Sequence, residues 1–269
     1  MKIRQSQTIL ITGTSSGIGQ TIATHLNTIG YNVIGTSRNP NPNAEIRQLK
    51  LDVTNEDLIN DCIRTLKDED ITIDILINNA GIALAGTIED TTIDEALNQM
   101  DTNYFGVVRM IKAFIPLMRE NGVGKIINIG SLAGLFGLPF QGHYCASKYA
   151  LEGLVESLRM ELKPFNIKMC NINPSDFNTE ITQHRKFAKT LSPHYTEQFN
   201  STMKVYEEGE KDGPDPIKIA KLVEQLLDSK SSWKIRYVVG NFDQTRTVFL
   251  KRLLGSQIFE KLLLGYYKI

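Results

Sequence analysis

Seven short runs rich in β-branched residues recur along the chain, and a longer helical pattern separates most neighbouring runs. Parallel strands need crossover connections, and helices on both faces of a sheet supply them with the usual right-handed sense. The alternation therefore predicts a doubly wound parallel sheet in three α/β/α layers, with ligands bound at the carboxyl ends of the strands. The runs are 8–11, 32–36, 46–51, 73–77, 125–129, 167–172 and 236–239.

Two segments depart from this alternation. No linker, repeat or low-complexity tract divides the chain, so we expect one domain over residues 1–269. The polar, aromatic-rich stretch 175–213 predicts a substrate lid, which can carry short helices of its own. Residues 245–269 form an amphipathic pattern with basic residues on the polar side, which fits packing over a substrate entrance, against a partner subunit or on a membrane surface.

The charge balance and the N-terminus narrow the class of protein. Lys and Arg total 30, as do Asp and Glu, so no excess of positive charge favours a nucleic-acid partner. The polar N-terminal residues precede an apolar run, 9–11, that is too short for a signal-peptide core, which predicts a cytoplasmic protein. The three cysteines are widely spaced and form no CxxC pair, so neither a disulfide framework nor a metal site is expected.

A glycine-rich loop follows the first predicted strand. Its residues are Thr12-Gly13-Thr14-Ser15-Ser16-Gly17-Ile18-Gly19. A phosphate approaches backbone N–H groups closely only where Cβ atoms are absent, and the start of a helix adds unpaired donors and the positive end of its dipole. The loop therefore predicts the pyrophosphate site of a dinucleotide in a Rossmann-like fold. The alternative is a strand-to-helix turn that needs glycine for steric reasons alone.

The second predicted strand ends at Ser37 and Arg38, where a dinucleotide fold places the adenosine ribose. A carboxylate at this place suits NAD(H), whereas a neutral residue followed by a cation attracts a 2′-phosphate. The pair predicts NADP(H) in preference to NAD(H). A solvated arginine in a surface turn is the alternative.

Tyr144 and Lys148 stand four residues apart at the start of a long helical pattern, so their side chains share one face. A free phenol has a pKa near 10, and a neighbouring ammonium lowers that value towards the range in which acid–base catalysis works. The spacing therefore predicts a proton-transfer pair with Tyr144 as the acid or base.

The glycine loop, Asn78-Asn79-Ala80-Gly81, Ser131 and the Tyr144–Lys148 pair together resemble the short-chain dehydrogenase/reductase family, in its single-domain branch, over residues from about 7 to 180. The resemblance implies that Ser131 hydrogen-bonds the substrate oxygen while Tyr144 donates a proton to it. Lys148 would tune Tyr144 and hold the nicotinamide ribose. Asn103 would complete the set by carrying a water link from this lysine, with a structural role as the alternative.

The same resemblance implies further cofactor contacts. Asp52 and Val53 would meet the adenine, unless they only cap a strand end. Asn79, Ala80 and Gly81 would line the adjacent wall, and Pro174 and Thr179 would lie at the nicotinamide. Where the family often has Pro-Gly, this chain has Pro174-Ser175, which leaves the backbone path at the nicotinamide open.

These features predict an NADPH-dependent carbonyl reductase, reversible as an alcohol dehydrogenase, with an apolar substrate of steroid, retinoid-like or long-chain type. The rival class is a non-catalytic NADP(H)-binding regulator or scaffold, and a sugar epimerase or dehydratase is disfavoured because no separate substrate domain is present. Family resemblance implies a homodimer or homotetramer through helices at about 92–118 and 143–163. The expected substrate-side residues, which could equally be packing residues, are Leu132, Phe136, Phe140, His143, Phe177, Tyr195, Phe199, Met203 and Tyr206.

Overall fold

All seven predicted strands join one parallel sheet, which confirms the doubly wound α/β fold. The computed structural model describes residues 6–179 and 184–269, so residues 1–5 of the polar N-terminal stretch and 180–183 of the expected lid lie outside the described residues. The strand order is β3-β2-β1-β4-β6-β7-β9. The strands are β1 Thr8–Thr12, β2 Asn32–Ser37, β3 Gln48–Lys50, β4 Ile75–Asn78, β6 Gly124–Ile129, β7 Ile167–Pro174 and β9 Arg236–Val239.

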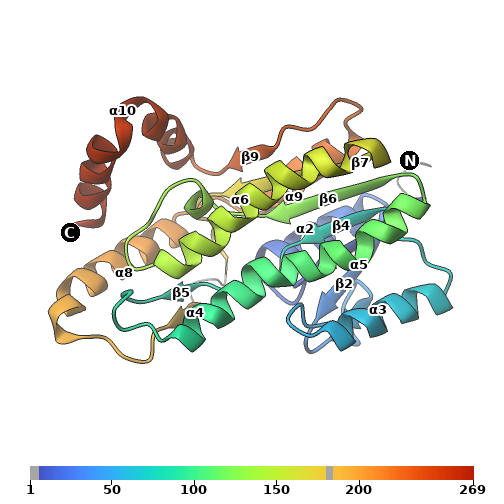
Figure 1. Ribbon diagram of the computed structural model, residues 1–269, viewed down its shortest axis with the longest axis horizontal. Coiled ribbons are helices and arrows are strands. Elements are labelled where there is room, and N and C mark those ends of the chain that lie inside the picture. The colour runs from blue at the N-terminus through green and yellow to red at the C-terminus, as the bar shows by residue number, and fades with distance from the viewer. Residues whose placement is uncertain (1–5, 180–183) are drawn as a thin grey trace.

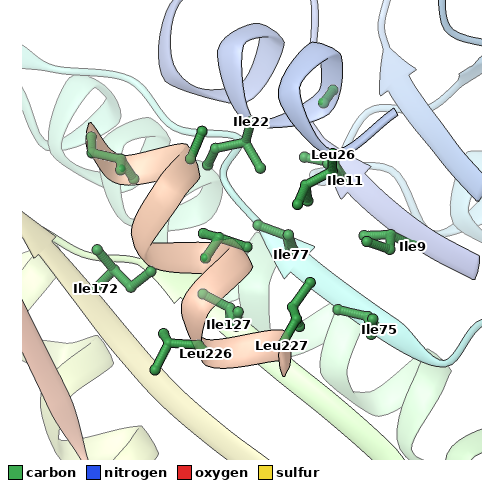
Figure 2. Packing of buried hydrophobic residues seen from close by; sticks show 14 of the residues in the cluster. Ile9, Ile11, Ile22, Leu26, Ile75, Ile77, Ile127, Ile172, Leu226 and Leu227 are labelled. Atoms are coloured by element: carbon green, nitrogen blue, oxygen red, sulfur yellow. The ribbon is translucent and has the colours of Figure 1, made fainter. Parts of the chain in front are cut away.

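Helices cover both faces of the sheet because strands buried on both sides carry apolar residues at nearly every position. One face packs on α2 (Gly17–Thr28) and α9 (Ile217–Asp228), where Ile22 and Leu226 meet the inward isoleucines of β1, β4, β6 and β7 (Figure 2). The opposite face packs on three helices (Figure 1). These are α3 Glu56–Asp68, α5 Gly106–Glu120 and α6 Gly142–Leu162.

A row of polar side chains crosses the sheet at one register position. Asn78 donates to Asn128 at 2.8 Å, Asn128 donates to Asn171 at 3.1 Å, and Asn171 donates to Glu152 of α6 at 2.7 Å. Glu152 also accepts from Nε of Arg236 at 2.5 Å. Because one register slip would leave these buried groups unpaired, the row aligns the strand ends that carry the site.

The predicted lid region and the C-terminal segment meet at the end of the molecule opposite the N-terminus (Figure 1). The lid region contains α8 (Thr196–Lys211) and the short strand β8 (Lys186–Phe187), which pairs with β5 (Leu84–Ala85). The sequence did not predict this second sheet, because two-residue strands leave no periodic pattern.

The C-terminal segment forms α10 (Phe242–Tyr267), which bends at Gly255, where φ is 70°. Its inner side packs on the lid and the site: Phe259 stacks edge-on against Phe136, and Tyr267 contacts Tyr206 of α8. Its outer side is also apolar, with Leu253 63 % exposed. Apolar residues therefore lie on both sides of the bent helix, and the amphipathic pattern of this segment stays a prediction.

Candidate active site

The glycine loop is shaped by contacts that leave no space for side chains. Gly13 and Gly17 have φ values of 71° and 59°, a region that favours glycine. A Cβ added at Gly13 would lie 2.9 Å from the Ala80 Cα, and one at Gly19 would collide with the Gly13 carbonyl oxygen. The loop then enters α2, whose N-cap, Ser16, makes no side-chain capping bond. The first N–H groups of α2 therefore meet the requirement for a phosphate site.

Asn79 and Ala80 hold this loop in place. The Asn79 Nδ2 donates to the carbonyl oxygens of Thr12 and Gly13 at 3.0 and 2.9 Å. The backbone N–H groups of Asn79 and Ala80 both donate to the Thr12 hydroxyl at 3.0 Å. These hydrogen bonds thus fix the conformation of the glycine loop. The sequence reasoning missed Thr12 as the residue that ties the two segments together.

At the end of β2, Arg38 is exposed and makes no ion pair within residues 6–179 and 184–269, while the Ser37 hydroxyl accepts the Asn39 N–H at 3.2 Å. Asp52 accepts two bonds from Thr54, at 2.9 Å from its N–H and 2.8 Å from its hydroxyl. Asp52 therefore closes the turn after β3, the capping alternative, while Val53 packs against Gly106.

Tyr144 lies in the first turn of α6, and its hydroxyl hydrogen-bonds the Ser131 side chain. Ser131 follows β6 and caps the short helix η2 (Leu132–Gly134), its hydroxyl accepting the Ala133 N–H at 3.1 Å. Burial raises the pKa of Tyr144 to about 12, and the bond to Ser131 opposes this rise. The phenol is therefore protonated at neutral pH.

The expected lowering of the Tyr144 pKa by Lys148 is wrong for this structure. The Lys148 ammonium lies 5.8 Å from the centre of the Tyr144 ring and donates to the Ile129 carbonyl oxygen at 2.9 Å. Burial lowers the pKa of Lys148 itself to about 8. Helical spacing places the two side chains on one face of α6. For each of them, however, burial has the largest effect on the pKa.

Asn103 lies in a π-helical turn, η1 (Asp101–Phe105), between α4 (Ile93–Met100) and α5. Its side chain accepts the Ile82 N–H at 2.8 Å and donates to the Ile82 carbonyl oxygen at 3.0 Å. It also donates to the Ser147 hydroxyl on α6 at 3.2 Å. Single π turns often occur at functional sites, and this one places Asn103 beside the helix that carries Tyr144 and Lys148.

The segment after β7 approaches the start of α2. Pro174 ends the strand, and a Cβ added at Gly17 would lie 3.8 Å from the Thr179 Cβ. Thr179 thus lies next to the glycine loop. Ser175 stands at the position where the family often has glycine. Its N–H donates to the Val239 carbonyl oxygen at 2.9 Å, so this hydrogen bond fixes the backbone after β7 without a glycine.

The predicted substrate-side residues do not lie together in the structure. Leu132 and Phe136 pack against Phe259 of α10, and a second cluster at the lid contains Phe140, Phe199, Met203 and Tyr206. Phe177 belongs instead to the core between the sheet and α9, so it is a packing residue. Tyr195 is also peripheral, because its hydroxyl donates to Glu89 at 2.9 Å. His143 is the second residue of α6 and is partly buried.

A polar cluster beside Tyr144 was missed by the sequence reasoning. Asp176 follows β7, and the Gln244 Nε2 donates to its carboxylate at 2.5 Å. Arg185 pairs with Glu210 of α8, and the charges of Arg185 and Asp176 both act on Tyr144. These residues are distant in the chain and come from four different elements or loops, so no spacing rule would have grouped them.

The described residues fit a nicotinamide dinucleotide. The glycine loop leads into the start of α2, whose N-cap makes no side-chain capping bond, Arg38 is exposed at the end of β2, and the Lys148 ammonium lies 5.8 Å from the centre of the Tyr144 ring. The set Asn103, Ser131, Tyr144 and Lys148 is thus gathered around α6, as a hydride-transfer enzyme requires.

Comparison with known proteins assigns the class. Residues 7–189 match the family model described as short chain dehydrogenase. The chain therefore belongs to the short-chain dehydrogenase/reductase family, whose members are oxidoreductases that act on CH–OH or C=O groups with a nicotinamide cofactor.

Among the relatives, a 3-ketodihydrosphingosine reductase of Bacteroides thetaiotaomicron is 39 % identical over 268 residues, which is 98 % of this chain and 99 % of the relative. Human retinol dehydrogenase 8 is 35 % identical over 65 % of this chain and 60 % of its own length. A short-chain dehydrogenase of Streptomyces avermitilis has a structure with a TM-score of 0.79 and 30 % identity, covering 92 % of this chain and 93 % of that one.

Proposed function

We propose that this protein is an NADPH-dependent reductase of a long-chain amino ketone of the 3-ketodihydrosphingosine type. The observation that carries the proposal is the similarity to the Bacteroides thetaiotaomicron reductase along nearly the whole of both chains, including the lid and α10. These two elements contribute to two apolar clusters, one of which contains Leu132, the residue after Ser131. The substrate class suits them, because 3-ketodihydrosphingosine is a saturated long-chain ketone with a neighbouring amino group and a terminal hydroxyl.

In this mechanism a bound NADPH supplies the hydride, and the residues of the chain position the carbonyl and deliver the proton. Ser131 holds the carbonyl oxygen by a hydrogen bond, and Tyr144 donates its phenolic proton to the same oxygen as negative charge develops there. Lys148, held by the Ile129 carbonyl oxygen, would bind the ribose hydroxyls of the cofactor. Asn103 is a positioning residue, since it fixes α6 against the π turn through Ser147.

Tyr144 holds its proton at neutral pH, which is the state that reduction of a carbonyl requires. Burial raises the pKa of its phenol to about 12, so the proton needed by a carbonyl oxygen is present. Oxidation would need the phenolate, which becomes populated only as pH rises towards that value. A non-catalytic cofactor-binding protein, the rival class, has no need of a phenol paired with Ser131 and Lys148.

The test is an absorbance assay of NADPH consumption with the purified protein. We expect 3-ketodihydrosphingosine in mixed micelles to be reduced with a kcat/KM at least about tenfold above that for all-trans-retinal or a steroid ketone, because the apolar clusters and the polar cluster match a long chain with a polar head. Equal or better turnover of retinal would contradict the substrate class. No turnover of any carbonyl compound would favour the rival class.

We further propose that the outer side of α10 rests on the membrane that holds such a substrate, with the rest of the protein in the cytoplasm. No helix in the described part of the chain is long and apolar enough to span a bilayer. Interfacial binding instead needs exposed apolar side chains near basic ones. On α10 the exposed apolar residues include Phe242, Phe249, Leu253, Ile258 and Leu262, and the exposed basic residues include Arg246, Arg252, Lys261 and Lys268.

Sedimentation with vesicles containing anionic lipid tests this contact. The double variant Phe249→Ser and Leu253→Ser is expected to lower the bound fraction severalfold, while Met160→Ser, at an exposed residue of α6, leaves it unchanged. Equal binding of all three proteins would argue against this membrane contact.

The homodimer or homotetramer stays a prediction. The exposed apolar residues Leu97 and Phe105 support an interface between subunits, and light scattering measures the oligomeric state.

A further inference from the structure

The carboxylate of Asp176 is partly buried and uses only one of its two oxygens in a hydrogen bond. Its oxygen Oδ2 accepts from Gln244, but Oδ1 accepts no hydrogen bond from residues 6–179 or 184–269. Helix α8 covers one side of the carboxylate, since a Cβ added at Gly209 would lie 2.8 Å from Oδ2. Oδ1 is therefore available to accept a hydrogen bond from a ligand.

Two charged groups act on the Asp176 carboxylate. They are Glu210 and Arg185, which pair with each other. Burial first, and the negative charge of Glu210 second, raise the pKa of Asp176 to about 6. A positively charged ligand at the carboxylate would favour its ionised form.

Arg185 provides a second, independent sign of a ligand. Its side chain is only 3 % exposed, and its Nε makes no hydrogen bond within the described residues. The guanidinium lies 5.4 Å from the centre of the Tyr206 ring, and its charge acts on both Tyr144 and Asp176. A buried N–H without an acceptor marks a place where a ligand oxygen fits.

We propose that Asp176 binds the ammonium group of the amino-ketone substrate, and that the Arg185 Nε donates to the neighbouring hydroxyl oxygen. The inference rests on the proposed function and names the residues that distinguish an amino ketone from a plain one. The amino and hydroxyl groups lie one and two carbons from the carbonyl that Tyr144 would protonate, and Asp176 and Arg185 lie close enough to Tyr144 for their charges to act on it.

The first experiment compares 3-ketodihydrosphingosine with its deamino analogue, 1-hydroxyoctadecan-3-one. Asp176→Asn keeps the shape of the side chain and removes its charge. We expect it to lower kcat/KM for the amino ketone at least about tenfold, and for the analogue by less than about threefold, because only the first loses a charged hydrogen bond. Asp243→Asn is the matched control, since Asp243 adjoins Gln244 but its side chain is 86 % exposed; neither substrate should be affected.

Thermal unfolding separates binding from a structural role. The folded-state pKa of Asp176 lies above its ordinary value, so its burial costs stability above about pH 6 and ceases to do so once the carboxyl is protonated at low pH. Asp176→Asn is therefore expected to raise the Tm by about 2–4 °C at pH 7.5 and to leave it unchanged at pH 4. The other titratable or charged groups that interact with Asp176 are Glu210, Arg185, Tyr144, Tyr206, Tyr266 and Tyr267.

Equal losses of kcat/KM for both substrates, or a lower Tm at pH 7.5, would overturn the proposal and make Asp176 a structural residue. A binding measurement distinguishes its failure from that of the proposed function. If wild type reduces no amino ketone, the proposed function fails, and calorimetry on the NADPH-saturated protein then compares dodecylamine with dodecanol. Tighter binding of the amine that Asp176→Asn abolishes supports the ammonium site; equal binding of the two compounds overturns it.

Discussion

Replacing Tyr144 by phenylalanine is expected to lower kcat for carbonyl reduction by roughly 10²–10⁴-fold, the range that a positioned proton donor supplies. The substitution removes the hydroxyl that Ser131 hydrogen-bonds and leaves the ring in its buried place. Affinity for NADPH should change by less than about threefold, because the phosphate loop and Arg38 are untouched. Steady-state absorbance kinetics and a fluorescence titration of NADPH measure the two effects.

Tyr149→Phe provides the matched control on the same helix. Tyr149 is 40 % exposed, and its hydroxyl accepts from Lys251 at 2.9 Å, away from Ser131. Its loss should leave kcat unchanged. If Tyr144→Phe retained wild-type turnover, another group would have to protonate the carbonyl oxygen, and the mechanism would be wrong.

The second large effect concerns the choice of cofactor. Arg38→Ala is expected to weaken NADPH binding roughly 100-fold, since the charge-assisted hydrogen bonds of a guanidinium to a phosphate are lost with the side chain. NADH binding should change by no more than about twofold, because NADH lacks the 2′-phosphate. Dissociation constants for both cofactors, measured at the same ionic strength, give the comparison.

Arg64→Ala tests for a general effect of charge. Arg64 lies on α3, its side chain is 70 % exposed, and its partner is Asp61 on the same helix. It should weaken neither cofactor. Comparable weakening of NADPH and NADH by Arg38→Ala would show that Arg38 shapes the turn after β2 and would contradict its predicted role in NADP(H) preference.

Several parts of the structure could be predicted from the sequence because their cause is local. The seven strands are runs of β-branched residues, and buried parallel strands need no more than that. Gly13 and Gly17 occupy positive φ values that follow from a tight strand-to-helix turn. The spacing of Tyr144 and Lys148 places them on one helix face wherever that helix lies.

Other parts of the structure depend on contacts between residues distant in the chain, so no local sequence pattern predicts them. The π turn at Asn103 is stabilised by Ile82 and Ser147, which are distant in the chain. The strands β5 and β8 are defined only by each other. The bend of α10 at Gly255 leaves apolar residues on both sides of that helix.

The sequence by itself predicted the sheet, the glycine loop and Tyr144 as the candidate proton donor, because each depends on residue types at short spacings. Only the tertiary structure decided the environment of that donor. Burial and Ser131, rather than Lys148, govern the pKa of Tyr144. Folding also brings Asp176, Arg185 and Glu210 beside it, since desolvation and long-range charge depend on which segments meet in space rather than on their order in the chain.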